Sequence, residues 1–404
     1  MVGWSVASLD SLANPLFTQL VRDSLYANPY GFTTNDLVTY PDSVYEQRIC
    51  AIPSAVPLYY DEEVRDYINL YAQRKKDLTE RMIGKSAWYY PMIESVLAAR
   101  QLPDVLKHLT MVESAMHLKA ASSKSAVGLW QIRPATGRAL GLEISSQLDQ
   151  RRDPLASSQA AVAYLKKLYE RYGDWYLSIA AYNYGIGNIS KAIARATVAE
   201  KKEPTTFFEL RAYLPAETRS YLPAFMAVVY LYHYQAEHNL RPAYFNLPFA
   251  GVDTVLLAAP LSLRQLSQTH RVGVDVLNFL NPALVQGVLP GRKNAYPVAL
   301  PLKVTDFPKT QPAPVSQCDA VTVRHVAQVV RRPERVVPNP ESMAPLVHFI
   351  EKGNTLAGIA AQYECTVAEL VQWNSLYEST IWAGDKLVVY VPRHALESEA
   401  LVRR

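Results

Sequence analysis

This chain of 404 residues contains only three cysteines, has a small net charge and lacks long apolar runs. Cys50, Cys318 and Cys365 lie far apart and fit no CxxC or Cys/His spacing, which argues against a disulfide framework or a structural zinc site. The eight histidines show no ligand spacing either, so no metal and no cofactor are expected. No apolar run approaches the ~18–20 residues of a transmembrane helix. The net charge of +4 is too small and too scattered for a nucleic-acid-binding protein.

The N-terminal part shows neither the pattern of a leader nor that of a domain. Residues 1–17 have no basic region followed by an apolar core, so no signal peptide is predicted there. Two interpretations stay open, a cytosolic protein or a secreted one whose leader was removed or missed. Proline follows Asn, Tyr or Ile at several points in residues 1–60, which we interpret as an extended arm that wraps a domain.

Tyrosine, in contrast, is abundant. There are 26 tyrosines against 10 phenylalanines and 6 tryptophans, and 22 of them lie at or before Tyr244. A phenol is apolar on the ring and polar at the tip, so it suits wet grooves that bind sugars as well as protein interfaces. With 49% hydrophobic and 19% charged residues, the chain can bury a substantial core, and its length predicts two or three domains.

Helical patterns dominate residues 61–248. Asp153-Pro154 is typical of a helix start, with a capping carboxylate and a proline at the first helical position. A last long helix is expected from about Glu217 to His238. Strand signals are nearly absent before residue 250, so an all-α domain is predicted here.

The remainder of the chain repeats itself at an offset of 93 residues. Each copy is predicted to form a strand, two short helices, a turn that contains asparagine and a closing strand. The first copy is assigned to residues 249–303 and the second to residues 346–393. Seven prolines from Pro308 to Pro345 indicate a semi-rigid linker, which we assign to residues 304–345, and a tail occupies residues 394–404.

Glu113 is the candidate for acid chemistry. It is expected at the C-terminal end of a helix, where the helix dipole disfavours a further negative charge. The apolar residues Leu109 and Val112 precede it, and desolvation acts in the same direction. Both effects would raise the pKa of Glu113 and keep it protonated, as a general acid requires. On position alone, a solvated glutamate at a helix end is the more common case.

Further motifs follow Glu113 in a fixed order. They are a loop of small residues ending in Gly128-Leu129-Trp130-Gln131, then Ala181-Tyr182-Asn183-Tyr184-Gly185, then Glu217-Thr218-Arg219-Ser220-Tyr221. With Glu113-Ser114, this order resembles the lytic transglycosylases of the goose-lysozyme-like superfamily, glycoside hydrolase family 23, of the membrane-bound D type. The repeats resemble LysM modules, which bind N-acetylglucosamine chains, although the first copy is degenerate. The resemblance covers about residues 60–392.

The resemblance implies a mainly α chain, with a lysozyme-like all-α catalytic domain followed by two small βααβ LysM modules. It implies peptidoglycan as the partner and substrate, cut between N-acetylmuramic acid and N-acetylglucosamine. Glu113 would protonate the glycosidic oxygen and then, as a base, take the proton of the muramic C6 hydroxyl, which closes a 1,6-anhydro ring without water. No second carboxylate is obvious beside Glu113 in the sequence, whereas a two-carboxylate glycosidase needs one.

The resemblance also assigns binding residues. Those expected to contact substrate or to support the acid are Ser114, Ser122, Gly128, Gln131, Tyr182, Asn183 and Glu217. In the second LysM module the corresponding residues are Gly353, Asn354, Thr355, Asn374 and Gly384. For each, a purely structural role is the alternative, as a core aromatic residue or a helix cap. A location in the periplasm or cell envelope is implied, and a lipid anchor outside the visible sequence is compatible with it.

The sequence departs from the family pattern at four places, one of them a pair of residues. His117-Leu118 replaces Asn-Pro, Ser125 replaces a glycine, Arg133 replaces a methionine and places a charge at the groove wall, and Tyr184 replaces a small residue. These departures leave two other functions open. One is a muramidase that hydrolyses the same bond, and the other is a non-catalytic scaffold that binds peptidoglycan through its LysM modules. A cytosolic protein with a borrowed fold is a remote fourth interpretation.

Overall fold

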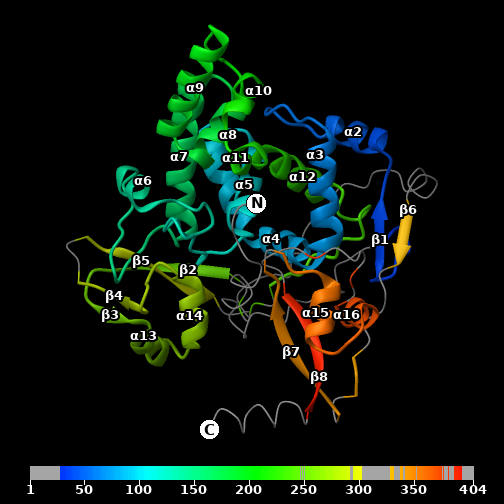
Figure 1. Ribbon diagram of the computed structural model, residues 1–404. Coiled ribbons are helices and arrows are strands. Elements are labelled where there is room, and N and C mark those ends of the chain that lie inside the picture. The colour runs from blue at the N-terminus through cyan, green and yellow to red at the C-terminus, as the bar shows by residue number, and fades with distance from the viewer. Residues whose placement is uncertain are drawn as a thin grey trace.

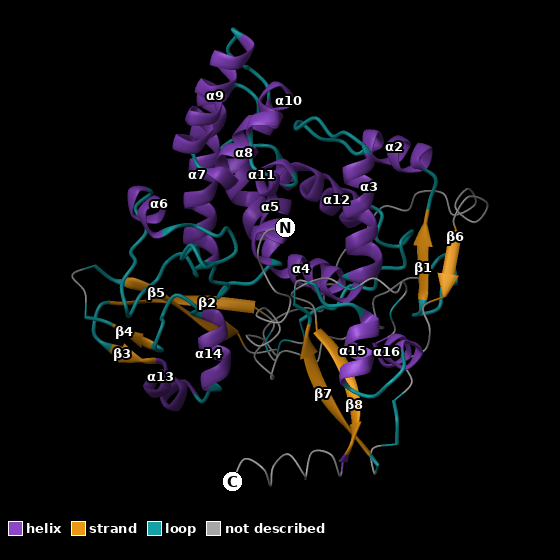
Figure 2. Cartoon of the chain, in the orientation of Figure 1, coloured by secondary structure: helices purple, strands orange, loops and turns teal. Residues whose placement is uncertain are grey.

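Figures 1 and 2 show the computed structural model of the chain. The structure describes residues 28–245, 247, 249, 251–291, 294–302, 328–331, 337–339, 342–351, 353–374, 376, 381 and 386–393. Cys318, Gly384, most of the predicted linker and the predicted tail lie outside the described residues. Cys50 and Cys365 are free thiols.

Helices form the first domain, as the sequence predicts. Their bounds are α2 (Asp42–Ala51), α3 (Glu62–Asn69), α4 (Lys76–Ala99), α5 (Leu109–Ser114), α6 (Pro134–Ala139), α7 (Pro154–Tyr172), α8 (Trp175–Tyr184), α9 (Ile186–Glu200), α10 (Phe207–Leu210), α11 (Ala216–Arg219) and α12 (Tyr221–His233). A π-helical turn, η2 (Leu70–Arg74), and two 3₁₀ turns, η3 (Asp104–His108) and η4 (Arg211–Tyr213), join some of them.

Local capping chemistry sets the bounds of the helices that carry the site. Asp153 accepts hydrogen bonds from two backbone N–H groups at the start of α7, and Gly173 ends that helix in a left-handed conformation (φ 64°). Asp174 then caps α8 through the Leu177 N–H. The start of α7 confirms the helix start predicted at Asp153-Pro154.

Helix α12 lies at the centre of the domain, against α3, α5 and α8. It is apolar on all sides, which fits a helix surrounded by others, and every residue from Tyr221 to Leu231 is buried. The single long helix predicted from about Glu217 to His238 is wrong in its bounds. The chain breaks at Ser220 into α11 and α12, and α12 ends at His233.

The described part of the N-terminal arm packs onto this domain and joins its core. It is less extended than predicted, because it contains α2 and also the strand β1 (Asp36–Thr39). Strand β1 pairs antiparallel with β6 (Gln328–Arg331). Tyr40 donates its hydroxyl to the Glu237 carbonyl oxygen (2.9 Å), and Tyr45 stacks on His238. Many of the tyrosines therefore serve the packing of the arm rather than a sugar site.

Two small modules follow, each built from an antiparallel pair of strands and two helices. The first contains β2 (Gly251–Leu257), the short strands β3 (Leu261–Ser262) and β4 (Val288–Leu289), α13 (Leu263–His270), α14 (Val274–Leu280) and β5 (Tyr296–Leu302). The second contains β7 (Met343–Phe349), α15 (Leu356–Gln362), α16 (Val367–Asn374) and β8 (Lys386–Pro392). Corresponding helices begin 93 residues apart, as the repeat predicts.

An asparagine closes each module in the same way. The Asn281 amide donates to the carbonyl oxygens of Leu277 and Ala299 and accepts from the Ala299 N–H. Asn374 forms the same three bonds with Leu370 and Val388, at 2.9, 2.8 and 2.7 Å. In both modules the side chain therefore joins the end of the second helix to the closing strand.

The first module is attached to the helical domain by backbone hydrogen bonds. The Asp149 N–H donates to the Ala283 carbonyl oxygen, and the Val285 N–H donates to that of Gln147, each at 2.9 Å. Leu148, between these two residues, is fully buried in the hydrophobic core of the module. The helical domain thus contributes one residue to the core of the first module.

Candidate active site

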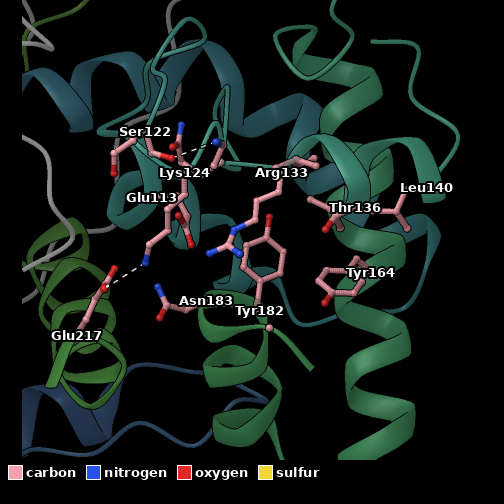
Figure 3. Close-up of a pocket in the computed structure, with 16 residues that line it drawn as sticks. Glu113, Ser122, Lys124, Arg133, Thr136, Leu140, Tyr164, Tyr182, Asn183 and Glu217 are labelled. Carbon is pink, nitrogen blue, oxygen red and sulfur yellow. Dashed lines mark hydrogen bonds and ion pairs between the residues drawn. The ribbon is translucent and has the colours of Figure 1, made fainter. Parts of the chain in front are cut away.

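A pocket of about 290 Å³ opens on the helical domain (Figure 3). Its walls come from the end of α5, the loop that leads into α6, one side of α7, the end of α8 and α11. Of the residues predicted to act on substrate, six line it, and these are Glu113, Ser122, Gln131, Tyr182, Asn183 and Glu217. The fold thus brings together residues that are up to about a hundred positions apart in the sequence.

Glu113 lies at the end of α5, with only 7% of its surface exposed. Burial raises its pKa from 4.5 to about 7, because an ionised carboxylate loses hydration there. The charge of Glu217 adds to this rise, whereas a hydrogen bond from Tyr221 and the charge of Arg133 oppose it. A carboxyl group with this pKa is partly protonated near neutral pH and can donate and accept a proton. The predicted shift is therefore confirmed in direction, with desolvation as its main cause.

Tyr221 is the immediate partner of Glu113. Its hydroxyl donates a hydrogen bond of 2.6 Å to Glu113 Oε1, and its side chain is 1% exposed. Burial holds the pKa of Tyr221 well above 10, so the phenol remains a donor. From the sequence, Tyr221 is a member of a motif without an assigned role. Its position in the Glu217–Tyr221 motif was the available signal.

Gln131 fixes the loop beside the acid. Its backbone is left-handed (φ 47°), and its Nε2 donates to the carbonyl oxygens of Ala120 and Gly128. In the part of the chain that the structure describes, the buried Oε1 atom of Gln131 has no hydrogen-bond partner. Ser122, at the other end of the loop, accepts a hydrogen bond from the Ala126 N–H (3.0 Å). Backbone and amide groups of the loop thus supply part of the hydrogen bonding that holds it in place.

Helices α8 and α11 supply the opposite wall. Tyr182 donates its hydroxyl to the Trp130 carbonyl oxygen at 2.7 Å, which ties α8 to the loop. Asn183 accepts a hydrogen bond from the Thr218 hydroxyl (3.3 Å) and so connects α8 with α11. Lys124 Nζ lies 3.7 Å from Glu217 Oε2, and this ion pair joins the loop to α11 (Figure 3).

Two residues predicted to bind substrate, Ser114 and Gly128, lie outside the pocket lining, and their predicted role is wrong. Ser114 is fully buried, and its hydroxyl interacts with the carbonyl oxygens of Thr110 and Leu129 and the His117 N–H. Gly128 adopts φ 88°, and a Cβ atom there would lie 1.9 Å from the Arg151 carbonyl oxygen. Glycine is needed because two backbone segments meet, not because a ligand needs room. Neither residue lines the pocket.

The sequence shows no obvious second carboxylate beside Glu113, but the fold brings Glu217, predicted as a substrate-binding residue, into the same pocket. Glu217 lines the same pocket, is close enough to raise the pKa of Glu113, and has 44% of its side chain exposed. Only the family resemblance, and no local pattern, indicated that Glu217 belongs to the same site, because more than a hundred residues separate the two carboxylates.

In the second LysM module, the predicted glycan-binding residues form structural contacts. Asn354 Oδ1 accepts from the Glu351 N–H (2.8 Å), and Thr355 caps α15 by accepting from the Gly358 N–H. Gly353 adopts φ 100°. Both amide hydrogens of Asn374 are used within the module, so its prediction as a glycan contact is corrected to a structural role. Gly384 lies outside the described residues.

Comparison with known families gives the class of protein. The transglycosylase SLT domain matches residues 91–204, which contain Glu113, the loop and α8. The LysM domain matches residues 348–389, within the second module. The chain therefore belongs to the transglycosylase SLT family and also carries a LysM domain.

The chain is also similar to individual proteins of known sequence or structure. Membrane-bound lytic murein transglycosylase D of Escherichia coli K12 is 28% identical over 334 residues, which are 81% of this chain and 69% of that protein. A putative tributyltin chloride resistance protein of Alteromonas sp. M-1 is 32% identical over 178 residues, 44% of this chain and 82% of the relative. Among solved structures, the 70 kDa soluble lytic transglycosylase of E. coli is 25% identical, with a TM-score of 0.31, over 36% of this chain and 24% of that chain.

Chemically, the pocket holds one carboxyl group that is partly protonated near neutral pH, one exposed carboxylate and two cations, Lys124 and Arg133. Among the residues that the structure describes, no three His, Cys, Asp or Glu side chains form a group that could hold a metal ion. Glu113 and its neighbours are thus suited to proton transfer on a polar ligand.

Proposed function

We propose that this chain is a peptidoglycan lytic transglycosylase that cleaves the bond between N-acetylmuramic acid and N-acetylglucosamine. The observation that carries the proposal is Glu113, a buried carboxyl group with a pKa of about 7 in the wall of a pocket. The SLT family match around this residue supports the substrate class.

In the first step, Glu113 donates its proton to the glycosidic oxygen, and the bond from this oxygen to the anomeric carbon breaks. The positive charge that develops at the anomeric carbon is met by the N-acetyl carbonyl of the same muramic residue. In the second step, Glu113, now a carboxylate, removes the proton of the C6 hydroxyl, and that oxygen bonds to the anomeric carbon. The product ends in 1,6-anhydromuramic acid, Glu113 is protonated again and no water is consumed.

The neighbours of Glu113 take supporting roles in this proposal. Tyr221 orients the carboxyl group through its 2.6 Å hydrogen bond and lowers the cost of the ionised intermediate form. Gln131 offers its unpartnered Oε1 atom as an acceptor for a substrate N–H or O–H group. Tyr182, Asn183, Ser122 and Glu217 contact the sugar from the other walls.

One observation favours a second candidate, a muramidase that hydrolyses the same bond. Glu217 lines the pocket opposite Glu113 and is exposed enough to activate a water molecule. The SLT family match and the lytic murein transglycosylase among the relatives support the transglycosylase over this candidate. A non-catalytic scaffold is the third candidate, since the LysM domain at residues 348–389 would bind glycan whether or not the helical domain is active.

Digestion of purified sacculi tests the proposal. The wild-type protein and the Glu113→Gln variant are incubated with sacculi, and the released muropeptides are analysed by mass spectrometry. We expect anhydromuramic ends from the wild type and a loss of activity of about 10²–10⁴-fold in the variant. Reducing ends, heavier by one water, would assign the muramidase. Equal, negligible release by both proteins, with both still bound to sacculi, would leave only the scaffold.

We also propose that the protein works in the bacterial cell envelope, where its polymeric substrate is found. The membrane-bound murein enzyme among its relatives supports this location, and membrane association through a lipid anchor is part of the same proposal. No helix in the described residues is long and apolar enough to cross a membrane.

A further inference from the structure

Arg133 is a cation in the pocket that the proposed mechanism does not use. It precedes Pro134, the first residue of α6, and its own backbone is extended. Its side chain is exposed and lines the pocket. Figure 3 shows it pointing into the cavity, toward Glu113 and Tyr182. The sequence alone identified Arg133 only as a departure from a family pattern.

The two cations of the pocket differ in their partners. Lys124 is paired with Glu217, with 3.7 Å between the charged atoms. Over the described ranges, the Arg133 guanidinium has no ion pair and no hydrogen bond. Its effect on Glu113 is an electrostatic one, because it opposes the rise in the pKa of that acid. The pocket therefore presents one uncompensated cation, and its guanidinium can bind a carboxylate with two parallel hydrogen bonds.

The substrate class offers a matching anion close to the cleaved bond. Muramic acid carries a lactyl ether on C3 of the ring whose anomeric carbon reacts. In glycan strands without stem peptides, this lactyl group ends in a free carboxylate. Where a stem peptide is attached, the same carbon is an uncharged amide, and the nearest carboxylates lie further out along the peptide. A cation in the wall next to Glu113 can thus distinguish the two forms of the strand.

We propose that Arg133 is a specificity-determining residue that binds the free lactyl carboxylate of muramic acid. The enzyme then prefers glycan strands from which stem peptides have been removed over strands that carry them. This inference rests on the proposed function, since it names the form of the substrate that the same site takes. It also places the reaction after an amidase-type reaction, which must first free the lactyl carboxylate.

Three glycan preparations test this assignment. The first consists of strands stripped of peptide by an amidase, with free lactyl carboxylates. The second consists of the same strands with those carboxylates converted to neutral methylamides. The third consists of uncrosslinked strands that carry stem peptides. The measured quantity is the ratio of kcat/KM between preparations, because a change in the pKa of Glu113 affects all three alike and cancels in the ratio.

We expect the wild type to prefer the free carboxylate over the methylamide by about tenfold or more, as one charge-assisted bidentate contact provides. The Arg133→Met variant should cleave both at similar rates. Arg138→Met removes an exposed positive charge of α6 that does not line the pocket, and it should keep the wild-type ratio. Added salt should reduce the preference of the wild type.

Two results would overturn the inference. One is an equal preference in the wild type and in Arg133→Met. The other is a wild-type preference for the peptide-bearing strands that Arg133→Met abolishes, which would assign the cation to stem-peptide carboxylates instead. A binding arm keeps the test independent of turnover. The Glu113→Gln variant, with and without Arg133→Met, is titrated with the first two preparations, so the affinity ratio is measured even if the wild type cleaves nothing and the proposed function fails.

Discussion

The Tyr221 hydroxyl donates a 2.6 Å hydrogen bond to Glu113 Oε1, and the two residues lie 108 positions apart in the chain. The first residue of α12 is thereby fixed to the end of α5, in the interior of the helical domain. Burial raises the pKa of Glu113 to about 7, and the Tyr221 bond restrains that rise because it favours the ionised carboxylate.

We therefore expect Tyr221→Phe to move the pH profile of activity upward. Without the phenol, the pKa of Glu113 rises further, so the acid stays protonated to higher pH and the alkaline limb of kcat/KM shifts in that direction. At neutral pH kcat should fall about tenfold, because the carboxylate form needed in the second step loses a donor worth ~1.4 kcal/mol. Activity against pH measures both effects.

A control for this variant comes from the same cluster of aromatic residues. Tyr182→Phe removes a hydroxyl that donates to the Trp130 carbonyl oxygen rather than to the acid. It should change KM or kcat without the same displacement of the alkaline limb. A Tyr221→Phe profile that moves downward, or does not move, would contradict the proposed role of this bond.

The raised pKa of Glu113 also predicts a pH-dependent stability. The folded-state pKa of about 7 exceeds the ordinary value of 4.5, so the folded protein binds this proton more tightly than the unfolded chain. The favourable term is present below pH 4.5 and is lost as the pH rises through about 7. The difference amounts to roughly 3 kcal/mol at alkaline pH.

Glu113→Gln isolates this term, because glutamine has nearly the same shape and does not titrate. We expect the variant to gain stability relative to the wild type as the pH rises from 5 to 8, by up to ~3 kcal/mol. Urea unfolding of both proteins across this range gives the difference. A constant difference between the two proteins would mean that Glu113 is solvated and titrates as in the unfolded chain.

Substitution of Glu217 distinguishes the transglycosylase from the muramidase. In the transglycosylase, Glu113 performs both proton transfers, so Glu217→Gln should raise KM several-fold and leave anhydromuramic ends as the product. In a muramidase, Glu217 would activate water, and the same substitution should reduce kcat by about 10²–10⁴-fold. Lys124→Met is the matched control, since it breaks the same ion pair and leaves the carboxylate in place. Product analysis by mass spectrometry, beside the kinetics, distinguishes the two outcomes.

What the sequence could predict was local. The helix start at Asp153 follows from capping chemistry within a few residues, and the repeat of the modules follows from matched positions. The rise in the pKa of Glu113 was predicted from its apolar neighbours. The contact with Tyr221 and the nearness of Glu217 depend on how α5, α11 and α12 cross, and no local pattern encodes that arrangement.

The wrong predictions of substrate binding at Ser114 and Gly128 also arise because local sequence does not encode the tertiary arrangement. A small residue beside an acid indicates close approach, but the sequence does not say whether a ligand or another part of the backbone approaches. At Gly128 the approaching group is the Arg151 carbonyl oxygen. The Arg151 guanidinium in turn pairs with Asp149 and donates to the carbonyl oxygens of Ser125 and Ile132. The loop beside the acid is thus shaped by a buried ion pair.

The Asp149–Arg151 ion pair connects the first module to the loop beside Glu113. Asp149 bonds through its backbone to Ala283 of that module and through its side chain to Arg151, which holds the loop. Loosening the module at Asn281 should therefore disturb the loop. Asn281→Ala removes the three side-chain hydrogen bonds to Leu277 and Ala299, at a cost of ~1–3 kcal/mol, and we expect kcat/KM on short glycan strands to fall several-fold.

Asn374→Ala is the matched variant, because it removes the same three bonds at the equivalent position of the second module. That module carries the LysM match, so its loosening should weaken retention of the protein on insoluble sacculi. Cleavage of short strands, which need no second attachment point, should change less than in Asn281→Ala. Both variants are measured by pull-down with sacculi and by kinetics on short strands. We expect Asn374→Ala to reduce mainly the pull-down and Asn281→Ala to reduce mainly the cleavage of short strands. Equal effects of the two substitutions on both measurements would show that the modules act alike, and that the contact through Asp149 does not reach the loop.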